Sequence, residues 1–276
     1  MTKREKLEIR SLHTIEELEE VRKLESKIWG ESDSIPSHQT LTAVKNGGLV
    51  LGAYYEGQLA GFQYSFPGFN GKDVYLCSHV LGTDKKFRNQ GIGEKLKQAQ
   101  RTEAVKLGYS LITWTYDPLE TMNGYLNIGK LGGVCSTYIP NCYGEMDDLL
   151  NSGLASDRFL IEWHINKENS GDSSGQGLDE SFALSNSLIQ WVVNAEGLPI
   201  PTATLPLPGH ECDITFVAVP KDFRKIRETN LDVASEWRMK TRDIFTSLVQ
   251  QSWQVTGFKK ITCDETPVHT YILTKR

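Results

Sequence analysis

The sequence predicts a mixed α/β (α+β) fold, in which a central sheet is flanked by helices and a smaller C-terminal α+β segment follows. Three observations predict it. Residues 49–83 contain three apolar, strand-like runs separated by turn dipeptides, which predicts an antiparallel meander. Residues 73–116 run from a strand through a Gly-x-Gly helix start to another strand, which predicts a parallel βαβ unit. Residues 169–180 are rich in Ser and Gly and nearly free of apolar residues.

This Ser/Gly-rich stretch defines the domain organisation that we expect. Such a composition is typical of a flexible linker. We therefore expect a first domain at residues 1–168, a linker at 169–180 and a C-terminal α+β extension at 181–276.

Local signals predict the elements of the first half. Residues 7–12 alternate as a short strand, and Thr14 with Glu17 forms a capping box that begins a helix. Residues 34–36 interrupt the chain, and a second short helix runs to about residue 46. The strands of the meander are residues 49–55, 58–66 and 73–83, with turns at Glu56-Gly57 and Asn70-Gly71.

The remaining elements follow the same reasoning. Gly91 and Gly93 open a helix that ends near residue 107, and a strand follows at 110–116. A helix at 120–131 and strands at 134–138 and 159–165 complete the first domain. The extension has strand-like runs at 188–193, 213–219 and 270–274, and a long helix over 232–255.

Composition excludes several classes of protein. The chain has 276 residues, of which 39% are hydrophobic, so it is neither fibrous nor disordered. Lys and Arg number 30 against 35 Asp and Glu, and this net charge of −5 argues against a general nucleic-acid binder. No apolar run has the length of a membrane helix, and the N-terminus lacks a secretory signal, so we expect a cytoplasmic protein without membrane contact. The five cysteines form no C-x-x-C pair, so we expect reduced thiols and no metal.

The segment from Arg88 to Glu94 carries the chemistry. It lies between a predicted strand and a predicted helix, and the free N–H groups at a helix start attract phosphates. Gly91 and Gly93 leave the backbone bare, so that a diphosphate can approach it. Arg88 adds a permanent cation for the phosphate oxygens.

Two other phosphate-binding motifs that contain glycine do not fit the sequence. A dinucleotide-binding fingerprint requires a third glycine where Leu96 stands. The segment from Gly124 to Lys130 approaches a Walker A motif, but Leu131 replaces the Ser or Thr that would bind magnesium. A tight turn that binds no ligand is the alternative that stays open.

Arg88-x-x-Gly91-x-Gly93 resembles the diphosphate loop of the GNAT acyl-CoA-dependent N-acetyltransferase superfamily, whose pattern is Q/R-x-x-G-x-G/A. Asn123 and the run from Gly129 to Gly132 are similar to a second segment of that family, on the helix after the fifth strand. The resemblance covers residues 5–166, so the chain looks like a long variant with a C-terminal extension. It implies a GNAT-like mixed central sheet.

The resemblance implies acetyl-CoA or another acyl-CoA, with succinyl-CoA as one alternative. Backbone groups near Leu81 and Thr83 would bind the pantetheine arm and polarise the thioester carbonyl, and Asn123 would lie near its thiol end. The diphosphate would bind to the loop. The implied cofactor-binding residues are Leu81, Thr83, Arg88, Asn89, Gln90, Gly91, Ile92, Gly93, Glu94 and Asn123.

The residues of catalysis are less defined, because the position at which the family often has a tyrosine acid is Ile128. Tyr125, one helical turn earlier, is the substitute acid, unless it only packs. His79, which shares the alternation of Leu81 and Thr83, is a candidate base, although a structural role is the alternative. Glu162 is a further candidate base acting through water.

The expected reaction is direct transfer of an acetyl or succinyl group from CoA to a primary amine of a small molecule or amino acid. Arg158 is the candidate cation for a substrate carboxylate, with a salt bridge to an acid as its alternative. Two other functions stay open: a non-catalytic CoA-binding regulator and a protein-lysine acetyltransferase. The extension would pack on the core, wall the acceptor pocket or form the surface of a homodimer.

Overall fold

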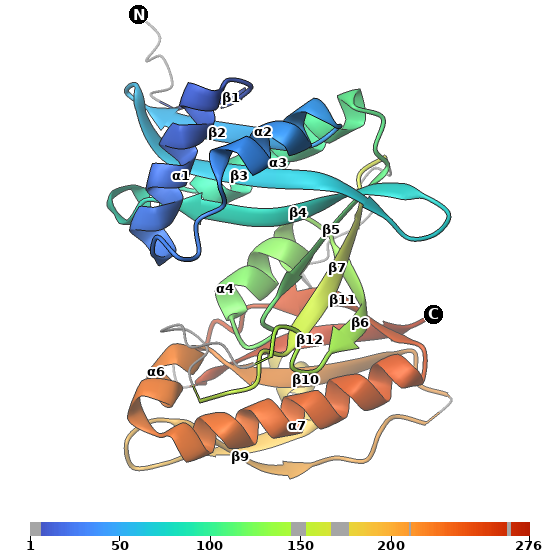
Figure 1. Ribbon diagram of the computed structural model, residues 1–276. Helices are drawn as coiled ribbons and strands as arrows, with labels where there is room; N and C mark the ends of the chain where they lie inside the picture. Colours follow the sequence, from blue (N-terminus) through green and yellow to red (C-terminus); the bar gives the residue numbers. More distant parts are fainter. Residues whose placement is uncertain (1–6, 145–152, 167–176, 210, 264–265) are drawn as a thin grey trace, which may run out of the picture. The chain divides into compact units, whose positions relative to one another are not determined.

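Figure 1 shows the computed structural model of the chain. The structure describes residues 7–144, 153–166, 177–209, 211–263 and 266–276. These residues fall into two units. Unit 1 holds residues 7–114 and 164–166, and unit 2 holds the other described residues. The chain passes from unit 1 to unit 2 within a strand, after Trp114.

Unit 1 combines a mixed sheet with helices. Its strand order is β1-β2-β3-β4-β5. Its elements are β1 (Leu7–Ser11), α1 (Ile15–Trp29), α2 (Ser37–Lys45), β2 (Leu49–Tyr55), β3 (Gln58–Phe69), β4 (Val74–Thr83), the 3₁₀ turn η1 (Lys85–Phe87), α3 (Ile92–Lys106) and β5 (Leu111–Tyr116), which ends in unit 2.

The sheet of unit 1 confirms the predicted topology. β1, β2, β3 and β4 pair with their neighbours in antiparallel fashion, as a meander requires. β4 and β5 are parallel, and α3 connects them. This is the βαβ unit that the sequence predicts around Gly91 and Gly93.

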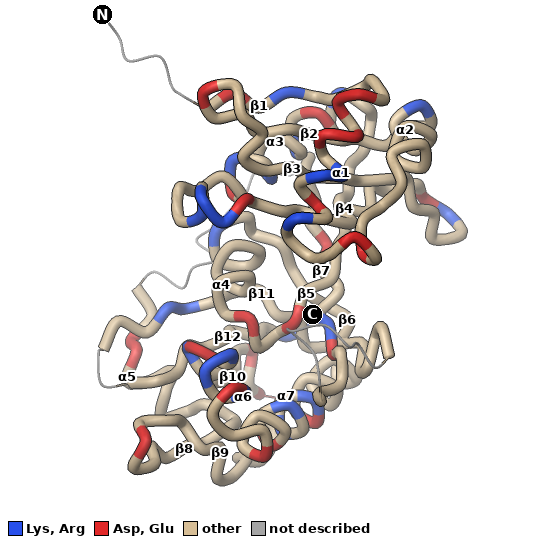
Figure 2. The backbone as a smooth tube through the Cα atoms, turned by 60° about the vertical axis from the view of Figure 1, so that its left-hand side comes forward, with Lys and Arg blue, Asp and Glu red and all other residues tan. Residues whose placement is uncertain are grey.

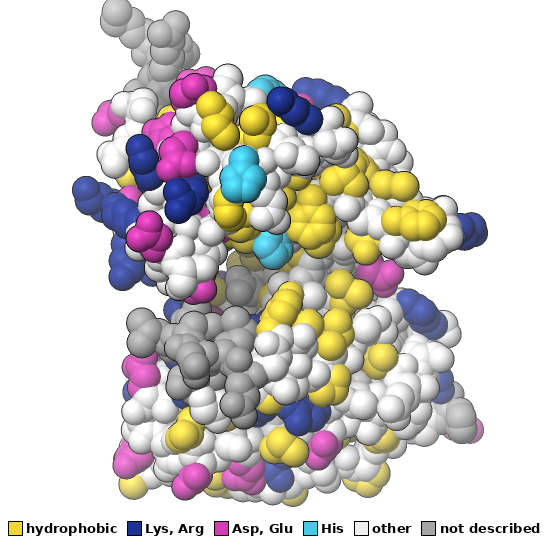
Figure 3. Space-filling view, in the orientation of Figure 1, with side chains coloured by type: hydrophobic (Ala, Val, Ile, Leu, Met, Phe, Trp, Pro, Cys, Tyr) yellow, Lys and Arg dark blue, Asp and Glu magenta, His cyan; other side chains and the backbone are white. Residues whose placement is uncertain are grey.

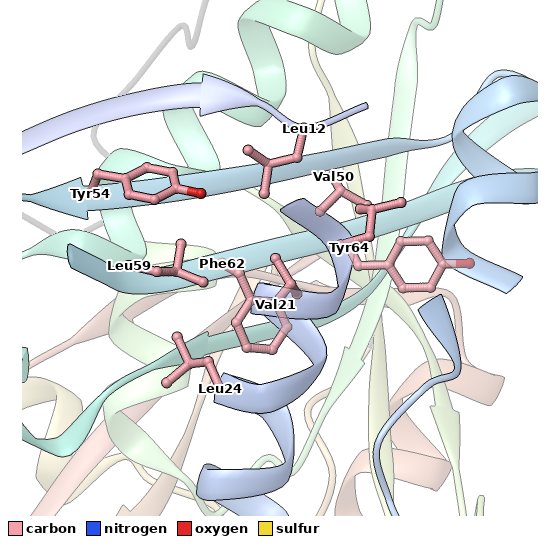
Figure 4. Close-up of a cluster of buried hydrophobic side chains, with 9 residues drawn as sticks. Leu12, Val21, Leu24, Val50, Tyr54, Leu59, Phe62 and Tyr64 are labelled. Carbon is pink, nitrogen blue, oxygen red and sulfur yellow. The ribbon is translucent and has the colours of Figure 1, made fainter. Parts of the chain in front are cut away.

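The core of unit 1 lies between α1 and the sheet (Figure 4). The capping box that begins α1 is present, because the Glu17 N–H donates to Thr14 Oγ1 at 3.3 Å and Glu17 Oε2 accepts from the Thr14 N–H at 3.1 Å. The cap fixes where α1 begins, and the spacing of Leu18, Val21 and Leu24 places their side chains on one buried face. The buried cluster consists of Leu12, Leu18, Val21, Leu24, Val50, Tyr54, Leu59, Phe62 and Tyr64.

Unit 2 contains a second run of strands, in the order β7-β6-β11-β12-β10, and a separate hairpin of β8 and β9. Its elements are α4 (Thr121–Gly124), the π-helical turn η2 (Tyr125–Lys130), β6 (Val134–Ile139), β7 (Arg158–His164), α5 (Glu180–Ser185), β8 (Ile189–Val193), β9 (Pro199–Thr204), β10 (Ile214–Pro220), α6 (Phe223–Thr229), α7 (Leu231–Gln250), β11 (Trp253–Lys259) and β12 (Val268–Lys275).

The two units group the described residues and leave the expected domain boundary at residues 169–180 a prediction. Residues 115–144 and 153–163, which we assigned to the first domain, lie in unit 2. The physical reason is strand pairing: β6 joins β11 at Cys135↔Val255. Of the expected linker, residues 169–176 lie outside the described residues, and α5 already begins at Glu180.

One predicted element is wrong at its end. The helix expected over 232–255 is α7, which ends at Gln250. Ser252 then takes a left-handed conformation, with φ at 66°, and Trp253 starts β11. The runs at 188–193, 213–219 and 270–274 are confirmed as β8, β10 and β12. β9 was not predicted, because Pro199 and Pro201 are unusual inside a strand.

The surface of unit 1 includes apolar side chains at the tip of the β3–β4 hairpin. Phe69 and Val74, which pair across the two strands, are 64% and 56% exposed. Figure 3 shows hydrophobic side chains gathered on the same unit, with histidines among them. Charged residues of both signs are distributed over both units (Figure 2).

Candidate functional site

β4 separates early from its parallel neighbour. Among the described residues, β4 pairs with β5 at two positions, Leu76↔Ile112 and Cys77↔Thr113. On its other side, β4 pairs with β3 as far as Thr83. One edge of residues 78–83 therefore has no partner strand in the described part of unit 1. Backbone groups on such an edge can bind an extended ligand.

A β-bulge in β4 changes the direction of its side chains. Ser78 pairs with Ser65 and Val80 pairs with Tyr64, so His79 is an extra residue in the ladder. The His79 ring lies beside the rings of Tyr64 and Phe66, at centroid distances of 6.0 and 5.5 Å. Bulges often re-aim a side chain next to an active site.

The bulge corrects the expected alternation along β4. Val80 packs against the core cluster on the α1 side of the sheet, where the rings beside His79 also lie. Leu81 lies on the α3 side, because its Cδ2 is 3.6 Å from where a Cβ on Gly93 would stand. His79 and Leu81 therefore do not share a face.

His79 has the protonation chemistry that a base requires. Surrounding protein atoms partly exclude water from the ring and lower its pKa below the ordinary value of 6.5. The imidazole is therefore neutral at neutral pH, and a neutral imidazole can accept a proton.

Asp84 anchors the segment that follows β4. Lys27 Nζ lies 2.6 Å from its carboxylate, and the Lys86 N–H donates to the same carboxylate at 3.1 Å. The hydrogen bond from Lys27 and that from the Lys86 N–H hold the pKa of Asp84 below its ordinary value. The Asp84 N–H also donates to the Ala60 carbonyl at 2.9 Å, so the end of β4 is tied to β3 and α1.

The turn into α3 has the geometry of an anion cradle. Asn89 and Gly91 have φ values of 63° and 72°, in the left-handed region. Gly91 is the N-cap of α3, and within the described part of the chain no side chain caps the helix there. The Lys95 N–H donates to the Gly91 carbonyl at 3.1 Å and closes the first turn of the helix. The amide groups in the first turn of a helix are the groups that can bind an anion.

The loop also has the space and charge that a diphosphate requires. A Cβ on Gly91 would meet no atom of the described residues within 4 Å, so they leave the space in front of the backbone open. Lys85, Lys86 and Arg88 are exposed cations in the same segment. The structure thus brings together seven predicted residues, Arg88, Asn89, Gln90, Gly91, Ile92, Gly93 and Glu94, with Leu81 beside Gly93 and Thr83 at the end of β4.

A buried polar cluster joins β3 and β4 to α3. Lys97 Nζ donates to Ser78 Oγ at 2.8 Å and lies 3.6 Å from the centroid of the Trp114 ring. Gln100 joins the cluster through its Nε2, which donates to Ser65 Oγ at 2.8 Å. Sequence reasoning missed Lys97. The sequence signal for its burial was its position directly after Leu96, on the buried side of a helix with a clear apolar stripe.

Unit 2 carries the other predicted residues. Asn123 is exposed in α4, and Tyr125 is the first residue of η2. Lys260 Nζ lies 3.8 Å from the centroid of the Tyr125 ring, and Lys130 Nζ lies 5.5 Å from it. The predicted helix at 120–131 is therefore one α turn followed by a π turn, closed by the Leu131 N–H donating to the Leu126 carbonyl. Such π turns are frequent at functional sites.

Two further positions that the sequence analysis names lie in η2 and β7. Ile128, at the family's usual acid position, is fully buried at 0% exposure. Glu162 in β7 pairs with Val134 of β6 and lies 4.0 Å from the Arg276 guanidinium. Glu162 is half-buried, so water can reach its carboxylate.

Arg158 is engaged by neighbouring protein groups. Its Nη1 donates to the Asp157 carbonyl at 2.9 Å and lies 3.8 Å from the Asp117 carboxylate. The Tyr143 ring also lies near its guanidinium, at 5.4 Å. Arg158 is therefore buried among charged and aromatic partners. A salt bridge to an acid, the alternative to binding a substrate carboxylate, accounts for these contacts.

The predicted site residues are thus divided by unit. His79, Leu81, Thr83 and the loop of residues 88–94 lie together in unit 1. Asn123, Tyr125, Arg158 and Glu162 lie in unit 2.

Comparison with known families decides the identity of the first part of the chain. Residues 16–123 match the family model described as Acetyltransferase (GNAT) family. This segment is a GNAT-family acetyltransferase domain. The match includes β4, the cradle and all of α3, so the resemblance carried by Arg88, Gly91 and Gly93 is confirmed. Residues 124–276 lie beyond the GNAT match.

Solved GNAT structures are similar to part of the chain. A GNAT-family acetyltransferase from Streptococcus pneumoniae is 16% identical, with a TM-score of 0.47, over 56% of this chain and 98% of its own. The Salmonella typhimurium protein yncA, solved with its cofactor acetyl-CoA, is 14% identical, with a TM-score of 0.48, over 61% and 98%. The ribosomal-protein-S18-alanine N-acetyltransferase of Escherichia coli is 16% identical, with a TM-score of 0.47, over 60% and 97%.

Three further findings on the chain are negative. None of the curated proteins matches the chain significantly. Among the described helices, none combines the length and apolar character needed to cross a membrane. Within the described residues, His, Cys, Asp and Glu side chains form no group of three or more that could hold a metal ion.

Proposed function

We propose that the chain is an acyl-CoA-dependent N-acyltransferase that moves an acetyl or succinyl group from CoA to a primary amine of a small molecule or amino acid. The family match supports acetyltransferase chemistry. The acyl group, the acceptor amine and direct attack without a covalent enzyme intermediate are part of the proposal.

One observation carries the proposal. The N-terminus of α3 has no side-chain cap in the described residues, and Gly91 there is left-handed with open space before it. It follows β4, which stops pairing with β5 after Cys77 and so has one unpaired edge in the described part of unit 1. The amides of α3 would bind the diphosphate of CoA, with Arg88 beside them. The free edge of residues 78–83 would hydrogen-bond the extended pantetheine arm.

Bound acyl-CoA would supply an electrophilic thioester carbonyl and a thiolate leaving group. An acceptor amine is normally protonated, so it must lose a proton before it attacks. His79, neutral and partly desolvated on β4, is the proposed acceptor of that proton. Tyr125 is the proposed donor of a proton to the departing sulfur, and Glu162 is the second candidate base, acting through water.

A non-catalytic CoA-binding regulator is the second candidate. The specific observation in its favour is Ile128, which is buried where the family often has its acid. A regulator would keep the cradle and bind CoA without turnover. The enzyme and the regulator would therefore both bind CoA. Only the enzyme would release free CoA thiol from an acyl-CoA.

Thermal-shift titration tests the cofactor. CoA, acetyl-CoA and succinyl-CoA are compared, with NADH and ATP as controls. A ligand at 100 times its Kd stabilises a fold by about 2.7 kcal/mol. A rise specific to CoA species supports the proposal, and the order of the thioesters indicates the acyl group. No response to any CoA species, from folded protein, contradicts it.

A pair of variants tests the cradle. Gly91→Asp places a side chain and a negative charge where the diphosphate would bind, so CoA affinity should be abolished. Gly57→Asp is the matched control, because Gly57 is also left-handed, at φ 83°, and also has nothing within 4 Å of its Cβ position. Near-normal CoA binding by folded Gly91→Asp would remove the loop from the site.

Turnover separates the enzyme from the regulator. Release of CoA thiol is followed with acetyl-CoA and succinyl-CoA against amines, free amino acids and lysine peptides. Transfer to free amines or amino acids supports the proposed reaction. Transfer to peptides alone indicates a protein-lysine acetyltransferase, and CoA binding without transfer indicates the regulator.

A further inference from the structure

Lys97 touches both strands of the parallel pair at the point where they part. Its Nζ is hydrogen-bonded to Ser78 of β4 at 2.8 Å and lies 3.6 Å above the ring of Trp114 in β5. The side chain comes from α3 and is buried, with 4% exposure. All three residues belong to unit 1.

The two residues that Lys97 contacts are those that would pair next. The β4–β5 ladder contains Leu76↔Ile112 and Cys77↔Thr113. Continuing the same register would set Ser78 opposite Trp114. Instead, the Lys97 amine contacts both Ser78 and Trp114. The last pair of the ladder is Cys77↔Thr113.

A network of polar side chains directs Ser78 towards Lys97. Ser78 Oγ also lies 3.4 Å from Gln63 Nε2 and 3.4 Å from Gln100 Oε1. Ser65 accepts from Gln63 at 2.5 Å and from Gln100 at 2.8 Å. These five polar side chains from β3, β4 and α3 are all buried. Among the described residues, Gln63 Oε1 has no hydrogen-bond partner, so the network is not optimised for stability alone.

An amine is an expensive choice for this position. Burial disfavours its charged form and lowers the pKa of Lys97 to about 7. A methionine or leucine would fill similar volume without that penalty, as at the buried neighbour Leu96. The Lys97 amine lies where the pairing of β4 and β5 ends, at a cost in stability. Its effect on these two strands explains its presence more readily than packing does.

We propose that Lys97 is a positioning residue that keeps β4 and β5 from pairing beyond Cys77 and Thr113. The resulting gap between the strands admits the pantetheine arm of CoA. This second step rests on the proposed function. Lys97 itself touches strand residues and is placed in no step of the reaction.

Hydrogen exchange tests the strand separation directly. Lys97→Met keeps the length of the side chain and removes the donor to Ser78, so β4 and β5 should pair further. Amide exchange in residues 78–83 and 114–116 should then slow relative to the unchanged protein. Lys106→Met, which removes an exposed lysine of the same helix, is the matched control and should leave both segments unchanged. Unchanged exchange in Lys97→Met overturns the proposal.

Ligand binding tests the consequence for CoA. The probes are CoA and 3′-phospho-ADP, which carries the same phosphates without the pantetheine arm. Lys97→Met should raise the Kd for CoA about tenfold and leave that for 3′-phospho-ADP nearly unchanged. Equal weakening of both ligands indicates general damage and overturns the role in the pantetheine gap.

Two outcomes separate this inference from the proposed function. If the unchanged protein binds neither probe, the proposed function fails, and hydrogen exchange alone decides whether Lys97 separates the strands. If Lys97→Met does not fold, Ser78→Ala takes its place, because it removes the acceptor and leaves the amine. The same exchange pattern and the same CoA-specific loss are then expected, and their absence overturns the proposal.

Discussion

Arg238 in α7 and Asp117, the residue after β5, form a bidentate ion pair. Nη1 and Nη2 of the guanidinium donate to the two carboxylate oxygens, the former at 2.9 Å. Arg238 is 3% exposed, and Arg158 lies 3.8 Å from the same carboxylate. Unit 2 therefore fixes the end of β5, where the strand turns towards α4, through a buried charge pair.

Removing one partner of this pair should be strongly destabilising. Arg238→Met leaves the Asp117 carboxylate buried without its main counter-charge, and we expect the free energy of unfolding to fall by about 3–5 kcal/mol. Arg224→Met is the control, because the Arg224–Glu120 pair is half exposed. Its loss should cost at most about 1 kcal/mol. Urea denaturation measures both, and equal losses would contradict the burial argument.

Gly124, the last residue of α4, is required by its neighbours. A Cβ there would lie 2.6 Å from Tyr271 Oη and 2.9 Å from the Phe258 ring. That hydroxyl donates to the Pro118 carbonyl at 2.8 Å and contacts Tyr116 Oη at 3.1 Å. Gly124→Ala should therefore lower the free energy of unfolding by about 1–3 kcal/mol.

Gly209→Ala provides the comparison for Gly124→Ala. A Cβ at Gly209 meets nothing within 4 Å, and its φ is not left-handed. We expect a change of at most about 0.5 kcal/mol by the same denaturation assay. A similar loss in both variants would show that helix or loop propensity, not the contact with Tyr271, governs position 124.

The features that the sequence predicts well are those with local causes. Thr14 and Glu17 form their capping box from four consecutive residues, and the hairpin turn at Glu56-Gly57 needs only its own backbone. The cradle belongs to the same class, since Gly91 takes its left-handed conformation at the helix start.

The features that sequence reasoning missed depend on distant partners. The bulge at His79 is defined by its pairing with Tyr64 and Ser65 of β3, and simple alternation cannot reveal it. The burial of Lys97 depends on Ser78 and Trp114. The pairing of β6 with β11 joins Cys135 to Val255, over a hundred residues later in the chain.

Tyr125 should affect turnover and leave CoA binding intact. Tyr125→Phe removes the hydroxyl proposed to protonate the leaving sulfur and keeps the ring against which Lys260 lies. We expect kcat to fall about 100-fold, the usual scale of a general acid, at unchanged CoA affinity. Tyr143→Phe, an exposed tyrosine of unit 2, is the control. An unchanged rate in Tyr125→Phe would remove it as the acid.

His79 should set the acid limb of the pH profile. Its pKa is lowered, so NMR titration of its ring should give a midpoint below 6.5. A base must be neutral, so kcat/KM should fall as the pH drops through that midpoint. His79→Gln should abolish this limb and lower kcat about 100-fold. His38→Gln, at an exposed helix position, should change neither. A limb that persists in His79→Gln would assign the base elsewhere, with Glu162 the next candidate.

Lys97 should make stability depend on pH. Its folded pKa of about 7 lies below the ordinary 10.5, so between these values the unfolded chain binds more protons than the folded one. The free energy of unfolding should therefore rise with pH across this window, by up to about 1.4 kcal/mol per unit, and level off below pH 7. Lys97→Met should remove this slope and be more stable at pH 7, with the two proteins converging towards pH 10.

Urea denaturation at pH 7, 8 and 9 measures the difference between the two proteins, so titration of other groups cancels. Lys106→Met, which loses an exposed lysine, should follow the unchanged protein. A Lys97→Met protein that is less stable at pH 7 would show that the Ser78 and Trp114 contacts outweigh the burial of the amine. A more stable protein with weaker CoA binding would show that stability is given up at this position for the separation of β4 and β5.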